Sequence, residues 1–183
     1  MVPFVVNVNF ISWYIMLMTF KHYSAKTKRA LTIDDLTIYD KQKTEFKPQG
    51  LWLSEGNAWY IHQLSFAEPG EYYWVQDVII DESKLYRLKT WQAIVNFTKK
   101  FGLDKSKFTC IKWDIVRKYL ESRGKYGIFL SEQAIAFCNN DRSVKSKYMW
   151  GHMFDVPSMC TWNPKEMILS ISKRKKAAKY NQL

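Results

Sequence analysis

At positions 47–54 the chain reads Lys47-Pro48-Gln49-Gly50-Leu51-Trp52-Leu53-Ser54. Pro48 and Gly50 end a polar, Lys-rich stretch, and the apolar residues that follow predict a short buried strand. Two further segments, 111–116 and 150–163, are also centred on tryptophan. Because all three mix Gly, Ser or Asp with aromatic residues, we interpret them as the walls of a cleft for a flat ligand.

Length and composition indicate one folded domain. The chain has 183 residues, of which 47% are hydrophobic and 16% aromatic, which is enough to form a core without disulfides or metal. Cys110, Cys138 and Cys160 are too widely spaced for a disulfide framework or a zinc site. We therefore expect reduced core cysteines in a cytoplasmic protein that holds no metal.

Positive charge is the second global feature. Lys and Arg total 28 against 17 acidic residues, a formal charge of +11, and such a field attracts phosphate-bearing partners, nucleic acid first among them. Lysines spread along a chain also simply keep it soluble. The one dense cluster, at 173–176 with Lys179, we interpret as a solvated helix end rather than a binding element.

The N-terminal stretch is apolar. The first 20 residues carry no charged side chain, and residues 5–20 are nearly long enough for a membrane helix. Asn7, Asn9 and Ser12 interrupt the stretch, and no positively charged leader region precedes it. We therefore expect no stable membrane association and treat residues 1–17 as an N-terminal extension.

The remaining pattern mixes strands and helices without regular alternation. Strands are predicted at 19–23, 50–54, 72–80, 85–88 and 126–130, helices at 58–66, 91–101 and 113–120, a helix start at 32–35, a strand-loop-strand region at 150–162 and a helical or extended tail from Pro164. This order predicts an α+β fold rather than a doubly wound sheet. We expect one domain over residues 18–170, followed by a basic tail at 171–183.

Common catalytic motifs are missing from the sequence. There is no Gly-rich phosphate loop, since the run from Gly124 to Gly127 lacks the spacing, and no Gly-x-Ser-x-Gly nucleophile elbow. His22, His62 and His152 form no metal-binding pair at helical spacing. Ordinary kinases, hydrolases and two-lobed dehydrogenases therefore lose support.

Residues 47–54 with Trp59, the stretch from Trp113 to Ile128, and residues 154–162 resemble a family of small phage and bacterial proteins related to the mono-ADP-ribosyltransferases. The resemblance covers about residues 19–169. It implies a split fold in which two small sheets grip NAD⁺. It also implies an enzyme that cleaves the bond between nicotinamide and ribose and passes ADP-ribose to a protein or nucleic-acid acceptor, in the cytoplasm of its own cell or of a host.

The resemblance also implies the site residues. Enzymes of this kind place a His or Arg from the first strand, an aromatic or Ser/Thr element from the second and a later acidic residue in the cleft. Asp155 is the nearest match for the acid, although the usual Glu-x-Glu or Gln-x-Glu signature is missing. The predicted catalytic residues are Asp155 and His22, and the predicted NAD contacts are His22, Tyr23, Gly50, Trp52, Ser54, Trp59 (or Tyr60) and Ser158.

The chemistry of these side chains agrees with those roles. A carboxylate at Asp155 would stabilise the ribosyl cation that forms as nicotinamide leaves. Neutral His22 could bond a ribose hydroxyl, and a flat ring such as Trp52 could stack on nicotinamide. Structural roles stay open beside these: Asp155 could cap a turn, the tryptophans could be core anchors, and the two serines could be turn residues.

Two other functions stay open. A non-catalytic, basic nucleic-acid-binding or interaction module would use the positive charge and stack bases on exposed aromatic rings. An RNA 2′-phosphotransferase on the same fold would need several Arg or His groups around a phosphate, and only Arg29 lies near His22 in sequence.

Overall fold

Strand β1 (Leu17–Ser24) lies antiparallel to β4 (Trp74–Asp81) over eight residue pairs, from Leu17 opposite Asp81 to Ser24 opposite Trp74. The computed structural model describes residues 16–25, 27–64, 74–105, 108–140 and 147–177. The strand predicted at 19–23 is therefore confirmed, and it begins one residue before the expected domain start. The apolar stretch at 1–15 lies outside the described residues. In the described part, no helix is long and apolar enough to cross a membrane.

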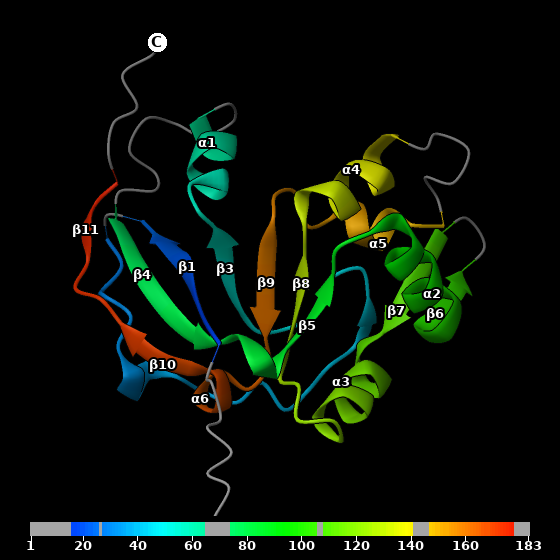
Figure 1. Ribbon diagram of the computed structural model, residues 1–183, viewed down its shortest axis with the longest axis horizontal. Coiled ribbons are helices and arrows are strands. Elements are labelled where there is room, and N and C mark those ends of the chain that lie inside the picture. Colours follow the sequence, from blue (N-terminus) through cyan, green and yellow to red (C-terminus); the bar gives the residue numbers. More distant parts are fainter. Residues whose placement is uncertain (1–15, 26, 65–73, 106–107, 141–146, 178–183) are drawn as a thin grey trace, which may run out of the picture.

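The described residues form one α+β domain with a large and a small sheet (Figure 1). The large sheet runs β10-β4-β1-β3-β9-β8-β5, with β11 beside β4. Its other strands are β3 (Leu51–Glu55), β5 (Leu85–Leu88), β8 (Gly127–Leu130), β9 (Ser158–Thr161), β10 (Ile168–Ile171) and β11 (Lys175–Lys176). Every pair in it is antiparallel except β5 with β8.

The small sheet and the helices complete the domain. The small sheet consists of β2 (Thr44–Glu45), β7 (Phe108–Lys112) and β6 (Gly102–Lys105), in that order. The helices are α1 (Ala58–Leu64), α2 (Trp91–Phe101), α3 (Trp113–Glu121), α4 (Glu132–Asn140), α5 (Met149–His152) and α6 (Pro164–Met167), with short 3-10 turns at Ile33–Asp35 and Glu82–Lys84. The predicted α+β class is confirmed.

Hydrophobic clusters cover both faces of the large sheet. Successive side chains of a strand point to opposite faces, and β8 shows the consequence. Ile128 and Leu130 belong to a cluster that packs against α2 to α5, whereas Phe129 belongs to a second cluster that includes Met167 of α6. A strand that is buried on both sides reads as a continuous apolar run, which is why residues 126–130 were predicted correctly.

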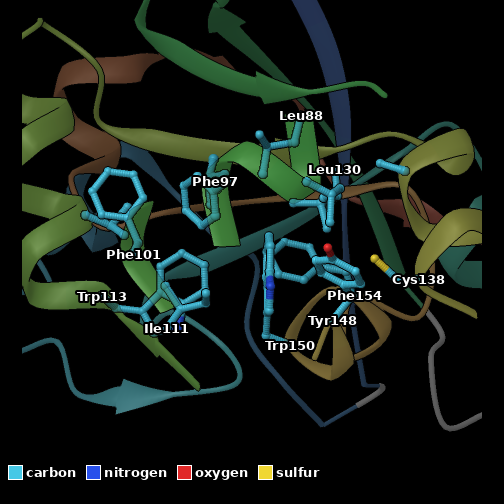
Figure 2. Packing of buried hydrophobic residues seen from close by; sticks show 14 of the residues in the cluster. Leu88, Phe97, Phe101, Ile111, Trp113, Leu130, Cys138, Tyr148, Trp150 and Phe154 are labelled. Atoms are coloured by element: carbon cyan, nitrogen blue, oxygen red, sulfur yellow. The ribbon is translucent and has the colours of Figure 1, made fainter. Parts of the chain in front are cut away.

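Aromatic rings dominate the first cluster (Figure 2). The ring centre of Phe97 lies 5.1 Å from that of Trp150 and 6.0 Å from that of Trp113. The indole nitrogens of both tryptophans are bonded, Trp150 to Thr98 Oγ1 at 2.8 Å and Trp113 to the Glu45 carbonyl at 3.0 Å. Trp113 is thus a core anchor, the role that was left open for it, and segment 111–116 lines neither of the two cavities described below.

Some local expectations need correction. Residues 149–152 form a helix where a strand was expected, because four residues are too few to show a helical period. The basic run ends in β11, which pairs with β4 through its backbone, so the helix end expected there is wrong. Helix α4 and the small sheet were not predicted. The three cysteines are free and buried, as expected.

Candidate functional site

The candidate site lies where β1 and β3 separate. Their pairing covers two residue pairs, Phe20 with Glu55 and Lys21 with Ser54. Beyond these pairs β1 continues along β4, and β3 runs along β9. A cavity of about 330 Å³ opens there, lined by Lys21, His22, Tyr23, Lys47, Gly50, Leu51, Trp52, Trp59, Phe154, Asp155 and Ser158. Its volume falls within the range of small-molecule sites.

Seven of the eight predicted site residues line this cavity. They come from the end of β1, from β3 and α1, and from the segment that leads into β9. Ser54 does not line it: its side chain is buried, and its hydroxyl lies 3.5 Å from the Gly56 carbonyl. Ser158 lines the cavity, but its hydroxyl donates to the Val156 carbonyl at 2.8 Å. That bond agrees with the turn role left open for Ser158.

His22 bridges the two separating strands. Burial lowers the pKa of its imidazole, and a hydrogen bond to the backbone of Trp52 opposes that effect. A hydrogen bond raises the pKa of an imidazole when it stabilises the protonated ring, which can only donate. The His22 ring is therefore the donor in this bond, and the Trp52 carbonyl is the acceptor. The imidazole is therefore neutral near pH 7, and its second nitrogen can accept a hydrogen bond from a ligand hydroxyl.

Aromatic rings form the walls of the cavity. Trp52 and Phe154 meet edge to face with ring centres 4.9 Å apart. Tyr23 is stacked on Tyr60 at 6.3 Å and donates at 3.4 Å towards Asn57 Oδ1. Burial raises the pKa of Tyr23 to about 12, with further contributions from Asp77 and Tyr60. The phenol therefore stays protonated, and the cavity offers flat apolar surfaces with a neutral imidazole between them.

Asp155 carries the negative charge at this cavity. Its Oδ2 lies 3.1 Å from Lys47 Nζ, and the two side chains are 38% and 39% exposed. Lys47 Nζ also lies 5.4 Å from the ring centre of Trp52. The backbone of Asp155 has a φ of 23°, a left-handed value that Asp and Asn tolerate better than most residues. A carboxylate paired with a lysine thus stands at the rim, and the left-handed backbone of Asp155 agrees with the turn role that was left open for it.

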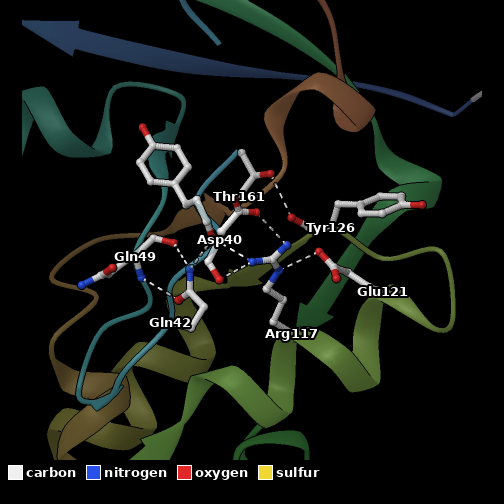
Figure 3. A network of polar contacts seen from close by, with 8 residues as sticks. Asp40, Gln42, Gln49, Arg117, Glu121, Tyr126 and Thr161 are labelled. Atoms are coloured by element: carbon white, nitrogen blue, oxygen red, sulfur yellow. Dashed lines mark hydrogen bonds and ion pairs between the residues drawn. The ribbon is translucent and has the colours of Figure 1, made fainter. Parts of the chain in front are cut away.

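A polar network holds the segment that carries Lys47 and Gly50 (Figure 3). The Gln42 side chain bonds both the N–H and the C=O of Gln49, at 2.9 and 2.7 Å. Arg117 of α3 donates to the Asp40 carbonyl at 2.6 Å and pairs with Glu121 at 2.8 Å. These bonds close the loop from 40 to 49 against α3 and so fix the position of the following strand.

Gly50 lets β3 approach β9 closely. A Cβ at this position would collide with the backbone oxygen of Thr161 and would lie 2.6 Å from Cys160 Sγ. The absence of a side chain is therefore required by strand packing. Its place in the cavity wall follows from that close approach.

A second cavity, of about 520 Å³, adjoins the first. His22 and Tyr23 line both, and the second is otherwise lined by Ser24, Ala25, Lys28, Arg29, Ala30, Leu31 and Asp35. Arg29 is ion-paired with Asp35, and its side chain is 85% exposed. The side-chain amide of Gln76 accepts from the Leu31 N–H and donates to the Leu31 carbonyl, which holds this loop against β4.

Sequence reasoning missed Lys21, Lys47, Leu51 and Phe154 in the first cavity and Lys28 in the second. Lys47 and Phe154 belong to the quoted tryptophan segments, and Lys21 adjoins His22, so adjacency was the available signal. Among the described residues, no three His, Cys, Asp or Glu side chains gather as a metal site.

Comparison with known proteins adds no relative. No protein-family model matches the chain, and neither a curated protein nor a solved structure does so. The candidate site therefore has to be interpreted from its own geometry.

Proposed function

We propose that this chain is a mono-ADP-ribosyltransferase-like enzyme that uses NAD⁺ as its substrate and transfers ADP-ribose to a macromolecular acceptor. The observation that carries this function is the convergence of seven residues, chosen from the sequence for that role, on one cavity. Those residues come from three segments that are more than 20 positions apart. The cavity opens within one continuous sheet, where the pairing of β1 with β3 ends after two residue pairs, and not between two small sheets as the resemblance implied.

The chemistry of the cavity suits nicotinamide. The nicotinamide ring of NAD⁺ is flat and positively charged, so it can stack on an aromatic face such as that of Tyr23 or Trp52, and Lys47 Nζ lies 5.4 Å from the Trp52 ring centre. His22, neutral and already bonded to the Trp52 carbonyl, offers its second nitrogen to a hydroxyl of the dinucleotide. Asp155 supplies the carboxylate that the reaction needs near the ribose.

The reaction breaks one bond and forms one bond. The bond between the ribose C1′ and the nicotinamide nitrogen breaks, and its electron pair leaves with neutral nicotinamide. The ribose then carries positive charge shared between C1′ and the ring oxygen, which Asp155 stabilises without forming a covalent bond. An oxygen, nitrogen or sulfur atom of the acceptor attacks C1′ and loses its proton to solvent.

The second cavity suits the rest of the dinucleotide. It shares His22 and Tyr23 with the first, so one elongated ligand could occupy both. Lys28 and Arg29 offer cations to the pyrophosphate, and a guanidinium binds phosphate in a bidentate manner. Arg29 is now paired with Asp35, and NAD⁺ would have to displace that ion pair, which is weak because the Arg29 side chain is 85% exposed to solvent.

The test uses the full chain with NAD⁺ labelled on the adenylate part. We expect release of free nicotinamide, transfer of label to protein or nucleic acid of a cell lysate, and NAD⁺ binding measured by calorimetry. When NAD⁺ is labelled on its nicotinamide part instead, the label should appear only in free nicotinamide and not in protein or nucleic acid. If the folded chain neither binds NAD⁺ nor releases nicotinamide, the proposed function is wrong.

A further inference from the structure

A pair of cations meets at one tyrosine ring on the surface formed by α2 and α3. Lys100 Nζ lies 3.4 Å from the ring centre of Tyr119, and Arg123 Cζ lies 3.7 Å from the same centre. Both distances are short for a cation on an aromatic ring. Two positive charges are thus held together at the end of α2 and just after α3.

The geometry of this cluster is fixed by further contacts. Arg123 Nη1 donates to the Tyr119 carbonyl and to Ser122 Oγ, each at 3.0 Å. Tyr119 also packs edge to face on Phe101, with ring centres 5.3 Å apart. The guanidinium is therefore held in place before any ligand arrives, so binding costs less side-chain entropy than it would at a freely moving arginine.

Positive charge in this cluster is not neutralised by neighbouring side chains. Within the described residues, neither Lys100 nor Arg123 forms an ion pair with a carboxylate. A hydrogen bond from Lys100 and then the nearby charge of Arg123 lower the pKa of the Tyr119 hydroxyl. By contrast, Lys47 and Arg117 have acidic partners. Because neither cation is paired with a carboxylate in the described residues, a phosphate can approach either one without first breaking an ion pair.

We propose that Lys100, Tyr119 and Arg123 form a binding site for the phosphate groups of a nucleic acid. Arginine and lysine are the side chains that bind phosphate in such complexes, and a tyrosine hydroxyl adds a donor. The formal charge of +11 makes a polyanion the partner that the whole field favours over a singly charged ligand. This site is separate from the two cavities, because Lys100, Tyr119 and Arg123 line neither of them. In Figure 1, α2 lies on the right, whereas α1 and β1 lie on the left.

The test is the salt dependence of binding to a labelled oligonucleotide, measured by fluorescence anisotropy. The double variant Lys100→Gln/Arg123→Gln should lower the slope of log K against log salt by about 1.4 on a single strand, or about 1.8 on a duplex. For a parent and a variant that bind equally at 1 M salt, a change of 1.4 corresponds to about 25-fold weaker binding of the variant at 0.1 M salt. A single-stranded and a duplex oligonucleotide are measured separately, and the tighter of the two shows which form of nucleic acid the protein prefers.

The matched control removes two charges elsewhere. Lys165→Gln/Lys173→Gln changes two exposed lysines on the β10 side of the molecule and should leave the slope within about 0.3 of the parent value. Melting temperatures of both variants establish that they fold. If the parent protein binds neither oligonucleotide, or if both double variants lower the slope of log K against log salt by the same amount, no phosphate site exists at Tyr119 and the inference is wrong.

Discussion

Replacing Asp155 by asparagine separates a catalytic role from a structural one. Asparagine keeps the size of the side chain and tolerates the same left-handed backbone, so the φ of 23° adds no new strain. The charge is lost. If the carboxylate stabilises the ribosyl cation, nicotinamide release should slow by about 10²-fold or more, or about 2.7 kcal/mol of transition-state stabilisation.

The cost to folding should be much smaller. Asp155→Asn removes the ion pair with Lys47, whose two side chains are more than a third exposed. Solvent screens such a pair, and its contribution is about 0–1 kcal/mol. For a chain of this length that corresponds to a melting temperature within about 4 °C of the parent.

The assay follows nicotinamide release by chromatography at saturating NAD⁺, beside thermal melting followed by circular dichroism. Glu166→Gln is the matched control, since Glu166 pairs with Lys84 at 3.4 Å at the surface and lies outside both cavities. It should melt like Asp155→Asn and release nicotinamide at the parental rate. Parental turnover in Asp155→Asn would refute the catalytic role, and Asp114 and Glu132 would be the next acids to test, although neither lines the two cavities described above.

Three further predictions concern the fold and the buried histidine. Gly50→Ala should lower the free energy of unfolding by about 3 kcal/mol, because the new Cβ meets strand backbone, and should lower the melting temperature by about 6–12 °C. Gly56→Ala is the control: its Cβ meets only open space at a φ of 52°, and it should cost about 1 kcal/mol. Equal losses of stability in the two variants would contradict the packing argument. Thr98→Val should lose about 1–3 kcal/mol in urea unfolding by leaving the buried indole N–H of Trp150 without its acceptor, whereas Thr98→Ser should keep that bond. Burial lowers the pKa of His22 below that of histidine in the unfolded chain, about 6.5, so the unfolded state binds the proton first as the pH falls. The free energy of unfolding should therefore fall below pH 6.5 by up to about 1.4 kcal/mol per pH unit. His22→Gln should lack this loss, and an unchanged pH dependence of melting in the variant would show that His22 is not its source.

The sequence predicted elements wherever the local pattern was strong. Strand β8 and helix α2 have clear patterns, and Gly102 ends α2 as expected. Strands β6 and β7 carry Gly, Asp and Lys residues, and they are strands because they pair with each other and with β2. Pairing of that kind depends on distant segments, so a local pattern does not contain it.

Site residues could be chosen from the sequence, but their arrangement could not. His22, Trp52 and Asp155 each have an ordinary structural role, and what distinguishes them is that they meet at one gap between strands. The ion pair between Lys47 and Asp155 joins positions that are 108 apart in sequence, and the local sequence around neither residue predicts it. Trp113 shows the opposite outcome, since an equally suggestive segment turned out to be core.

The cations that give the net charge of +11 differ in what they contact. Some, such as Lys47 and Arg117, are paired with carboxylates and serve the architecture or the cavity rim. Others, such as Lys125, donate to a backbone carbonyl, here that of Ser83. Lys100 and Arg123 are brought together at Tyr119 without an acidic partner in the described residues. Because Lys100 and Arg123 keep their charge at a fixed geometry and meet at one ring, a partner that carries phosphate should be sought there first.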